Sequence, residues 1–165
     1  MILRPETPDD VEDIHDLTQR AFAQMSYSDG SEGAILKRLR ADGDLALSLV
    51  AEREGRIVGH VAFSPVMVGT QTGWFGLGPI SVEPILQRQG IARALVEQGL
   101  SELRSKGAEG CVLIGDPKLY RRLGFKSNGK LTYGDVPVEA VQFMGFKGQT
   151  PEGQLTYAPA FGPDP

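Results

Sequence analysis

The stretch Leu77-Gly78-Pro79-Ile80-Ser81-Val82-Glu83-Pro84, continued by Gln87-Arg88-Gln89-Gly90-Ile91-Ala92-Arg93, is the most informative part of this chain. It predicts an apolar strand, a short turn and a helix that starts at a glycine. The first amides of such a helix have no partner inside the helix, so they form an anion site, and Gly90 lets a ligand approach the main chain closely. No Gly-Lys-Ser/Thr is present and no further glycines stand at dinucleotide-binding spacing. The pattern therefore excludes a nucleotide P-loop and a Rossmann fingerprint.

Composition and charge set the broad class. The chain has 165 residues, 41% of them apolar and 23% charged, which is ordinary for a globular protein with one core. We therefore expect a single domain over residues 1–165. The formal net charge of −4 argues against a nucleic-acid partner, whose binding face would be basic. The same charge agrees with a cationic acceptor substrate, although a whole-chain charge does not locate a pocket.

The N-terminus and the cysteine usage predict where the protein works. The residues Met1 to Pro5 have no signal-peptide layout, and no apolar run in the sequence approaches the ~18 residues of a membrane span. Cys111 is the one cysteine, so it has no partner for an internal disulfide, and it lies in the apolar run Cys111-Val112-Leu113-Ile114. That context favours a buried strand residue over a nucleophile. We expect a cytoplasmic protein with no membrane partner.

The segments on either side of the opening stretch predict a mixed sheet. Three successive antiparallel strands are expected at 45–53, 56–68 and 74–82, and the last of them contains the first part of the opening stretch. The helix after Gly90 leads to a short apolar strand at 112–115, and a crossover of this length makes the strands before and after it parallel. Residues 117–123 are expected to form a short helix, with a further strand beginning at Phe125.

The two ends of the chain complete the expected element order. A first strand at residues 2–4 is followed by a helix that Thr7 caps and that Tyr27-Ser28-Asp29-Gly30-Ser31 interrupts, before it resumes over 32–40. Residues 141–146 and 155–158 are expected to pair as a last hairpin, whose strands could also pair with a second copy to give a homodimer. The tail 161–165 is expected to be docked or frayed.

Pro79 lies inside the predicted strand, shortly after two glycines, Gly76 and Gly78. Because proline removes a ladder donor, the strand must be bulged or unpaired on one side near Pro79. A parallel neighbour that separates from it there would leave a wedge lined by free main-chain groups. The alternative is a plain bulge beside a tight turn.

A second motif, Tyr120-Arg121-Arg122-Leu123-Gly124-Phe125, follows the strand after the helix. Gly124 is a helix terminator and Phe125 a core anchor, so these two residues alone carry little functional information. Their occurrence together with the pattern Gln-x-x-Gly-x-Ala at 87–92 is more specific. The two motifs resemble those of the GNAT (Gcn5-related) N-acetyltransferase superfamily.

This resemblance implies an α+β fold (α/β mixed): a mixed, mostly antiparallel sheet of about seven strands with flanking helices and a splayed parallel pair formed by the fourth and fifth strands. It also implies acetyl-CoA as cosubstrate, with no metal. By resemblance, the main chain of Ile80, Ser81 and Val82 binds pantetheine and the thioester carbonyl, and the amides from Arg88 to Arg93 bind the pyrophosphate. The expected coenzyme-binding residues are thus Ile80, Ser81, Val82, Gln87, Arg88, Gln89, Gly90, Ile91, Ala92 and Arg93.

Two departures from the family pattern bear on the chemistry. Gly115-Asp116-Pro117 stands where many relatives have an asparagine, and this Gly-Asp-Pro variant resembles one branch of the superfamily with poorly defined substrates. Glycines 76 and 78 stand where some relatives place a glutamate as general base. The base assignment of those relatives therefore does not carry over.

The reaction implied is acetyl transfer to a primary amine of a small molecule or a protein by direct attack on the thioester. Tyr120 is the expected general acid for the departing thiolate, because a phenol is a suitable donor at neutral pH; the alternative is a tyrosine that packs the pocket wall. Glu83 is the expected base and His60 a second candidate, and both residue types are more often structural at such positions. Arg88 and Arg93 are natural phosphate partners, with Arg121 and Arg122 as weaker candidates.

Acceptor recognition is assigned, by family architecture, to the loop around Met25, Tyr27 and Asp29, with Trp74 and Phe143 as further walls. Two other classes of function stay open. A catalytically silent acyl-CoA-binding sensor would keep the wedge and lose transfer, and a plain structural module would bind no coenzyme.

Overall fold

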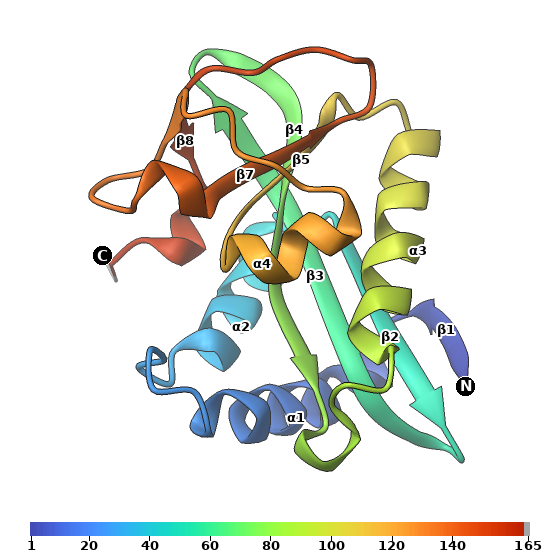
Figure 1. Cartoon of the computed structure of the whole chain (residues 1–165). Coiled ribbons are helices and arrows are strands. Elements are labelled where there is room, and N and C mark those ends of the chain that lie inside the picture. Colours follow the sequence, from blue (N-terminus) through green and yellow to red (C-terminus); the bar gives the residue numbers. More distant parts are fainter. Residues whose placement is uncertain (164–165) are drawn as a thin grey trace.

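Figure 1 shows a computed structural model of the protein, which describes residues 1–163. Asp164 and Pro165, the last positions of the expected domain and tail, lie outside the described residues. The strands are β1 (Ile2–Pro5), β2 (Leu47–Arg53), β3 (Arg56–Val68), β4 (Gln71–Val82), β5 (Gly110–Ile114), β6 (Leu131–Thr132), β7 (Val141–Gly145) and β8 (Gly153–Thr156). The helices are α1 (Val11–Ala23), α2 (Glu32–Asp42), α3 (Ile91–Ser105) and α4 (Pro117–Tyr120). Short 3-10 turns are η1 (Pro8–Asp10), η2 (Pro84–Leu86), η3 (Arg121–Leu123), η4 (Val138–Ala140) and η5 (Pro159–Phe161).

The strands form a mixed sheet of eight strands with the order β1-β2-β3-β4-β5-β7, while β8 pairs with β3 and with β6. The β4–β5 and β6–β8 pairs are parallel and the others antiparallel. Helix α3 lies on one face of the sheet, and α1 and α2 lie on the other (Figure 1). The predicted mixed α+β fold with a parallel β4–β5 pair is therefore confirmed, with eight strands among residues 1–163 where the family resemblance implied about seven.

Helices α1 and α2 cover their face of the sheet through a stripe of apolar residues. Asp10 stabilises the entry to α1, because its carboxylate accepts a hydrogen bond from the Thr7 amide at 2.7 Å. Ile14 and Leu17 then repeat at helical spacing and are fully buried. The C-cap of α2 is Gly43, with φ of +76°, the left-handed conformation that glycine adopts without steric cost. The predicted break between the two helices is confirmed.

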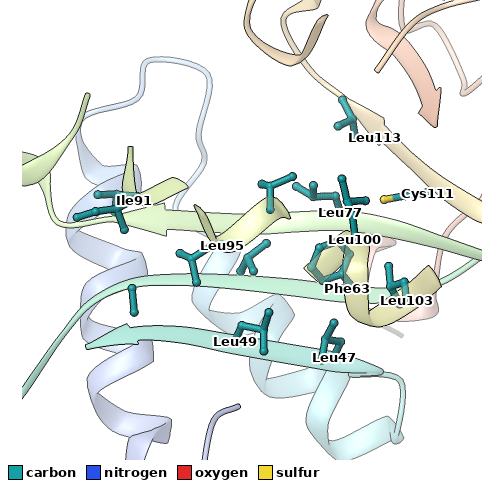
Figure 2. Close-up of a cluster of buried hydrophobic side chains, with 14 of the residues drawn as sticks. Leu47, Leu49, Phe63, Leu77, Ile91, Leu95, Leu100, Leu103, Cys111 and Leu113 are labelled. Atoms are coloured by element: carbon teal, nitrogen blue, oxygen red, sulfur yellow. The ribbon is translucent and has the colours of Figure 1, made fainter. Parts of the chain in front are cut away.

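Helix α3 packs on the opposite face and builds the larger core cluster (Figure 2). Leu95, Leu100 and Leu103 project from α3 onto Leu49 and Phe63 of the central strands. A Cβ atom at Gly99 would overlap the ring of Phe63, so glycine allows this close approach of helix and sheet. The close packing fixes the start of α3 beside the end of β4, where the predicted site lies.

The C-terminal strands differ from the predicted hairpin. β7 pairs with β5, whereas β8 pairs with β3 and β6. The prediction that 141–146 and 155–158 pair with each other is wrong, because each strand finds a partner far away in the sequence. No strand begins at Phe125 either: this residue is buried in the α3-side core, and the neighbouring Lys126 makes only an isolated bridge to Phe143.

Candidate active site

The parallel strands β4 and β5 separate halfway along their length. Their pairing runs from Trp74 opposite Gly110 to Gly76 opposite Val112 and then ends, although β4 continues to Val82. On the other side of β4, Val61 faces Ile80 and Phe63 faces Leu77, with a register shift between them. Two residues of β4, Gly78 and Pro79, thus stand opposite one residue of β3, which is the arrangement of a β-bulge. The predicted bulge near Pro79 and the separation of the parallel neighbour are both confirmed.

The register also determines which main-chain groups of β4 face the opening. The Glu83 amide donates to the Val58 carbonyl at 2.8 Å, and the same register continues through Ser81 opposite His60. In an antiparallel ladder the hydrogen-bonded and non-hydrogen-bonded pairs alternate. The main chains of Ile80 and Val82 therefore point away from β3, toward the separated β5. The main chain of Ser81 points toward β3, so Ser81 faces the opening with its side chain alone.

A cavity of about 590 Å³ occupies this separation. The far half of β4, the start of α3, the end of α1 and the segment from β5 to η3 enclose it. Its lining residues are Ala21, Phe22, Met25, Tyr27, Leu77, Gly78, Pro79, Ile80, Ser81, Val82, Leu86, Gln87, Arg88, Gly90, Ile91, Ala92, Arg93, Val96, Leu113, Ile114, Leu119, Tyr120, Arg122 and Leu123. All of the expected coenzyme-binding residues except Gln89 are among them.

The start of α3 presents an anion-binding surface to this cavity. The helix has no side-chain cap and no acidic residue in its first turn, whereas the first turn of α1 contains Glu12 and Asp13. The positive end of the α3 dipole is therefore left without a protein counter-charge. Arg88 and Gly90 adopt positive φ values of +66° and +88°, and such left-handed residues turn successive amides toward one concave surface.

The charged side chains near this helix start are arginines. Arg88 is exposed and makes no ion pair within residues 1–163, which leaves its guanidinium available to a ligand. Arg93 is also exposed and binds Glu97 at 2.8 Å, a pair that costs little to exchange for a phosphate because it is solvated. Gln87 donates to the Val82 carbonyl at 3.4 Å, so this side chain connects the turn to the open edge of β4.

Tyr120 ends α4 and borders the cavity. Its ring packs edge-on against Phe125, with ring centres 6.3 Å apart. Burial raises the pKa of the Tyr120 phenol above its ordinary value, and the nearby Tyr27 adds to the shift. The phenol is thus protonated at neutral pH, the state that a proton donor needs.

Glu83 stands directly after β4, but its carboxylate is held by Arg20 of α1 at 2.8 Å. It is not among the residues that line the cavity. Glu83 therefore does not contact the cavity directly, and its role as a base stays a prediction.

His60 lies in a second polar group on the α1–α2 side of the sheet. Its Nε2 atom is 2.7 Å from the Ser48 hydroxyl, which also donates to Glu6. Glu6 in turn accepts two hydrogen bonds from Arg40, at 2.9 and 3.0 Å. Burial lowers the pKa of His60 to about 4, so the imidazole is neutral at pH 7. His60 is fully buried and does not line the β4–β5 cavity.

Of the residues predicted to recognise the acceptor, Met25 and Tyr27 line the cavity and Asp29 does not. Asp29 instead accepts a hydrogen bond from the Ser31 amide at 3.0 Å and shapes the loop. The prediction that Trp74 and Phe143 form walls is wrong, because both are buried in a separate core cluster on the other side of the paired part of β4 and β5.

The sequence pattern missed several residues of the cavity. Phe22 belongs to the apolar stripe of α1, and Leu119 and Leu123 sit between the residues of the tyrosine motif. Gly115 leaves space for the ring of Tyr120, because a Cβ atom at this position would lie 2.6 Å from Cε2 of Tyr120. The Gly-Asp-Pro variant was the available signal, since its glycine makes room for the ring and its Asp116 caps α4 through the Lys118 amide at 2.9 Å.

Two further features concern residues 1–163. Within this part of the chain, no group of three or more His, Cys, Asp or Glu side chains is arranged to hold a metal ion. None of its helices has the length and apolar character to cross a membrane.

The family model and the sequence relatives that match this chain agree with one another. The family model of the acetyltransferase (GNAT) domain matches residues 3–127. The uncharacterized N-acetyltransferase YhbS of Escherichia coli (strain K12) is 41% identical over 128 residues, which cover 76% of this chain and 74% of YhbS. A second N-acetyltransferase of the same strain, YjhQ, is 30% identical over 129 residues, covering 71% of this chain and 65% of YjhQ.

Solved structures agree with the sequence relatives. A GNAT family acetyltransferase from Brucella melitensis in complex with acetyl-CoA superposes with a TM-score of 0.87 at 43% identity, covering 98% of this chain and 97% of that one. YhbS from Escherichia coli in complex with CoA superposes with a TM-score of 0.86 at 33% identity, covering 97% and 91%. Both similarities extend over nearly the whole chain, including the separated strands and the start of α3.

Proposed function

This chain belongs to the GNAT family of N-acetyltransferases, and from that premise we propose that its β4–β5 cavity holds acetyl-CoA and that the acetyl group passes to a primary amine. The observation that carries the proposal is the end of β4–β5 pairing at Gly76, which leaves the main chains of Ile80 and Val82 without a strand partner on that side, beside an uncapped helix start. The complexes of the two similar structures with acetyl-CoA and CoA support it.

The residues that line the cavity suit each part of the coenzyme in turn. The pantetheine arm carries amides, and the open main chains of Ile80 and Val82 offer both donors and acceptors to them. The pyrophosphate is an anion, and the amides at the start of α3 together with Arg88 suit it. The apolar side chains of Leu77 and Val96 border the same space and exclude water from the thioester.

Acetyl transfer requires that the amine and the thioester are positioned for attack, that the developing oxyanion is stabilised, and that the leaving thiolate receives a proton. The amine nitrogen forms a bond to the thioester carbon, the carbon–sulfur bond breaks, and its electron pair leaves with sulfur. In this proposal, a main-chain N–H of Ile80 or Val82 stabilises the negative charge that develops on the carbonyl oxygen. Tyr120 donates its phenolic proton to the leaving thiolate. Holding both reactants in attack geometry lowers the barrier further, by as much as about 7 kcal/mol in favourable systems.

Glu83 is the proposed acceptor of the amine proton, acting through water because Arg20 holds its carboxylate. The variant Glu83→Gln keeps the size of the side chain and removes the base. We expect kcat to fall, with the acidic limb of the pH–rate profile flattened. An unchanged profile would remove Glu83 from the mechanism and leave proton loss to bulk water.

The acceptor is proposed to be a primary amine on a small molecule or on a protein, used in the cytoplasm. A homodimer also stays a prediction, which light scattering on the purified protein tests. The loop with Met25 and Tyr27 is the proposed entrance for the acceptor, because it borders the cavity next to Tyr120.

Two measurements test the function. Calorimetric titration with acetyl-CoA reports coenzyme binding, and a thiol-release assay over a panel of primary amines reports transfer. Binding together with amine-dependent release is expected. Binding without release on any amine would favour the alternative, a silent acyl-CoA-binding sensor, and absence of binding would contradict both.

A further inference from the structure

The charged residues that line the β4–β5 cavity all have the same sign. Among the described residues of the lining, the ionised side chains at neutral pH are Arg88, Arg93 and Arg122, and none of the lining residues is an aspartate, glutamate or histidine. A second ammonium group on an acceptor would therefore enter without a carboxylate to pair with. Burying a charge without a partner is unfavourable.

Three carboxylates that lie close to the cavity in the chain are already engaged. Glu83 is held by Arg20 at 2.8 Å, Asp116 accepts from the Lys118 amide at 2.9 Å, and Asp29 accepts from the Ser31 amide at 3.0 Å. Glu83 would have to leave Arg20 to bind an acceptor cation, and none of these three carboxylates is part of the cavity lining. The negative net charge of the whole chain is thus not available inside the site.

The rim of the cavity is apolar and unusually exposed. Tyr27 is 78% exposed, Leu119 55% and Ile114 36%, and all three line the cavity. They come from the α1–α2 loop, α4 and the end of β5, which meet around Tyr120. Large apolar side chains that stay exposed at a site indicate an apolar ligand surface.

From these two features we infer that the acceptor is a monoamine: one primary amine on an apolar or aromatic body, with no second cationic group. This inference rests on the proposed transferase function and narrows its substrate class. It excludes polyamines and other polycationic amines as preferred acceptors. Specificity here arises from an unpaired charge on the rejected substrate as well as from apolar contact with the accepted one.

A matched pair of acceptors tests the inference. Hexylamine and 1,6-diaminohexane have the same carbon chain and differ by one terminal ammonium. Thiol release from acetyl-CoA is measured with each at the same amine concentration and pH. We expect kcat/KM for hexylamine to exceed that for the diamine by at least about tenfold.

A charge-insertion variant then locates the effect. Tyr27→Glu places a carboxylate on the rim at a position that is 78% exposed, so the fold should tolerate it. The matched control is Ile85→Glu, which adds the same charge at a position that is 85% exposed and outside the lining. Because the readout is the ratio between two acceptors, a general loss of activity cancels. We expect the ratio to shrink about fivefold in Tyr27→Glu and to stay unchanged in Ile85→Glu.

The outcomes separate the two proposals. Equal turnover of both amines, or a preference for the diamine, overturns the monoamine inference and leaves the transferase function standing. A ratio that shrinks equally in both variants also overturns it, because the charge then acts from outside the cavity. If acetyl-CoA binds but neither amine releases thiol, while the wider amine panel is also inactive, the transferase function fails and the acceptor class fails with it.

Discussion

The β4–β5 junction and the cluster around His60 lie on adjoining strands but hold opposite kinds of polar group. At the junction, main-chain groups of Ile80 and Val82 lack a strand partner, and few side chains are titratable. Around His60, the side chains of Glu6, Arg40 and Ser48 bind one another. The residue types most often linked with catalysis thus bind one another, apart from His60 Nδ1, which has no partner among the described residues, whereas the proposed site consists largely of backbone and apolar groups.

The contrast between the two regions shows where the binding capacity of this fold comes from. Polar groups that have found partners stabilise the protein, and polar groups that the sheet leaves open are available to a ligand. A histidine beside a serine and a glutamate therefore carries less functional information here than a proline that interrupts a strand. Each experiment below perturbs one of the two regions and asks whether the other is affected.

The largest effect is expected at Tyr120. Tyr120→Phe removes the proton donor and keeps the ring on Phe125, so kcat should fall about 100-fold with little change in the KM for acetyl-CoA. The control is Tyr133→Phe, the same substitution in a tyrosine that packs against Tyr157. Steady-state thiol release measures both. Full turnover in Tyr120→Phe would reduce this residue to a wall of the pocket.

The next effect concerns stability in the His60 cluster. Glu6→Gln removes the charge that Arg40 and Ser48 bind, and we expect a loss of about 2 kcal/mol in the free energy of unfolding, or about 30-fold in the unfolding constant. Urea denaturation measures it, with kcat of the folded enzyme unchanged. Asp42→Asn serves as control, since its pair with Arg38 is partly exposed and 3.6 Å long and should contribute less than about 0.5 kcal/mol. A larger loss of activity than of stability in Glu6→Gln would give the cluster a catalytic role.

A pH effect on stability is expected from the same cluster. Because the pKa of His60 is lowered to about 4 from the 6.5 of an unfolded histidine, the unfolded chain binds a proton more readily between these values. The contribution of His60 to stability is complete above about pH 6.5 and is lost as the pH falls toward about 4, with a slope of at most about 1.4 kcal/mol per pH unit. His60→Gln should remove this slope in urea denaturation, while His15→Gln leaves it in place. Identical slopes in both variants would contradict the assignment.

The smallest effect is expected at the phosphate end of the junction. Arg88→Ala should raise the KM for acetyl-CoA about fivefold, the equivalent of ~1 kcal/mol, and leave kcat within twofold. Arg104→Ala removes the same charge at the other end of α3, where the guanidinium lies 4.7 Å from the centre of the Phe146 ring. Its KM should not change. Equal effects of the two variants would mean that Arg88 acts only through overall charge.

The parts of the site that the sequence predicted are those encoded locally. The missing donor of Pro79 predicts the bulge, and the run from Gln87 to Arg93 predicts a helix that begins without a cap. Tyr120 is recognised through the glycine and phenylalanine that follow it. In each case neighbours in the sequence are also neighbours in space, so the pattern contains the relevant geometry.

The parts that the sequence did not predict depend on partners distant in the chain. The pairing of β7 with β5 and of β8 with β3 is decided by which sheet edges are free, and a strand's own residues do not encode that choice. Trp74 is an aromatic residue near the site in sequence, yet strand alternation turns it into the core. The opposite main-chain directions of Ser81 and Val82 likewise follow from a register that only the assembled sheet defines.

The most direct test is a crystal structure of the protein grown with acetyl-CoA. We predict density for the pantetheine arm between β4 and β5, with its amides bonded to the main chains of Ile80 and Val82 and its pyrophosphate on the first amides of α3. Density for the arm elsewhere on the protein, or a β4 strand paired with β5 from Gly76 through Val82 with no space for the arm, would contradict it.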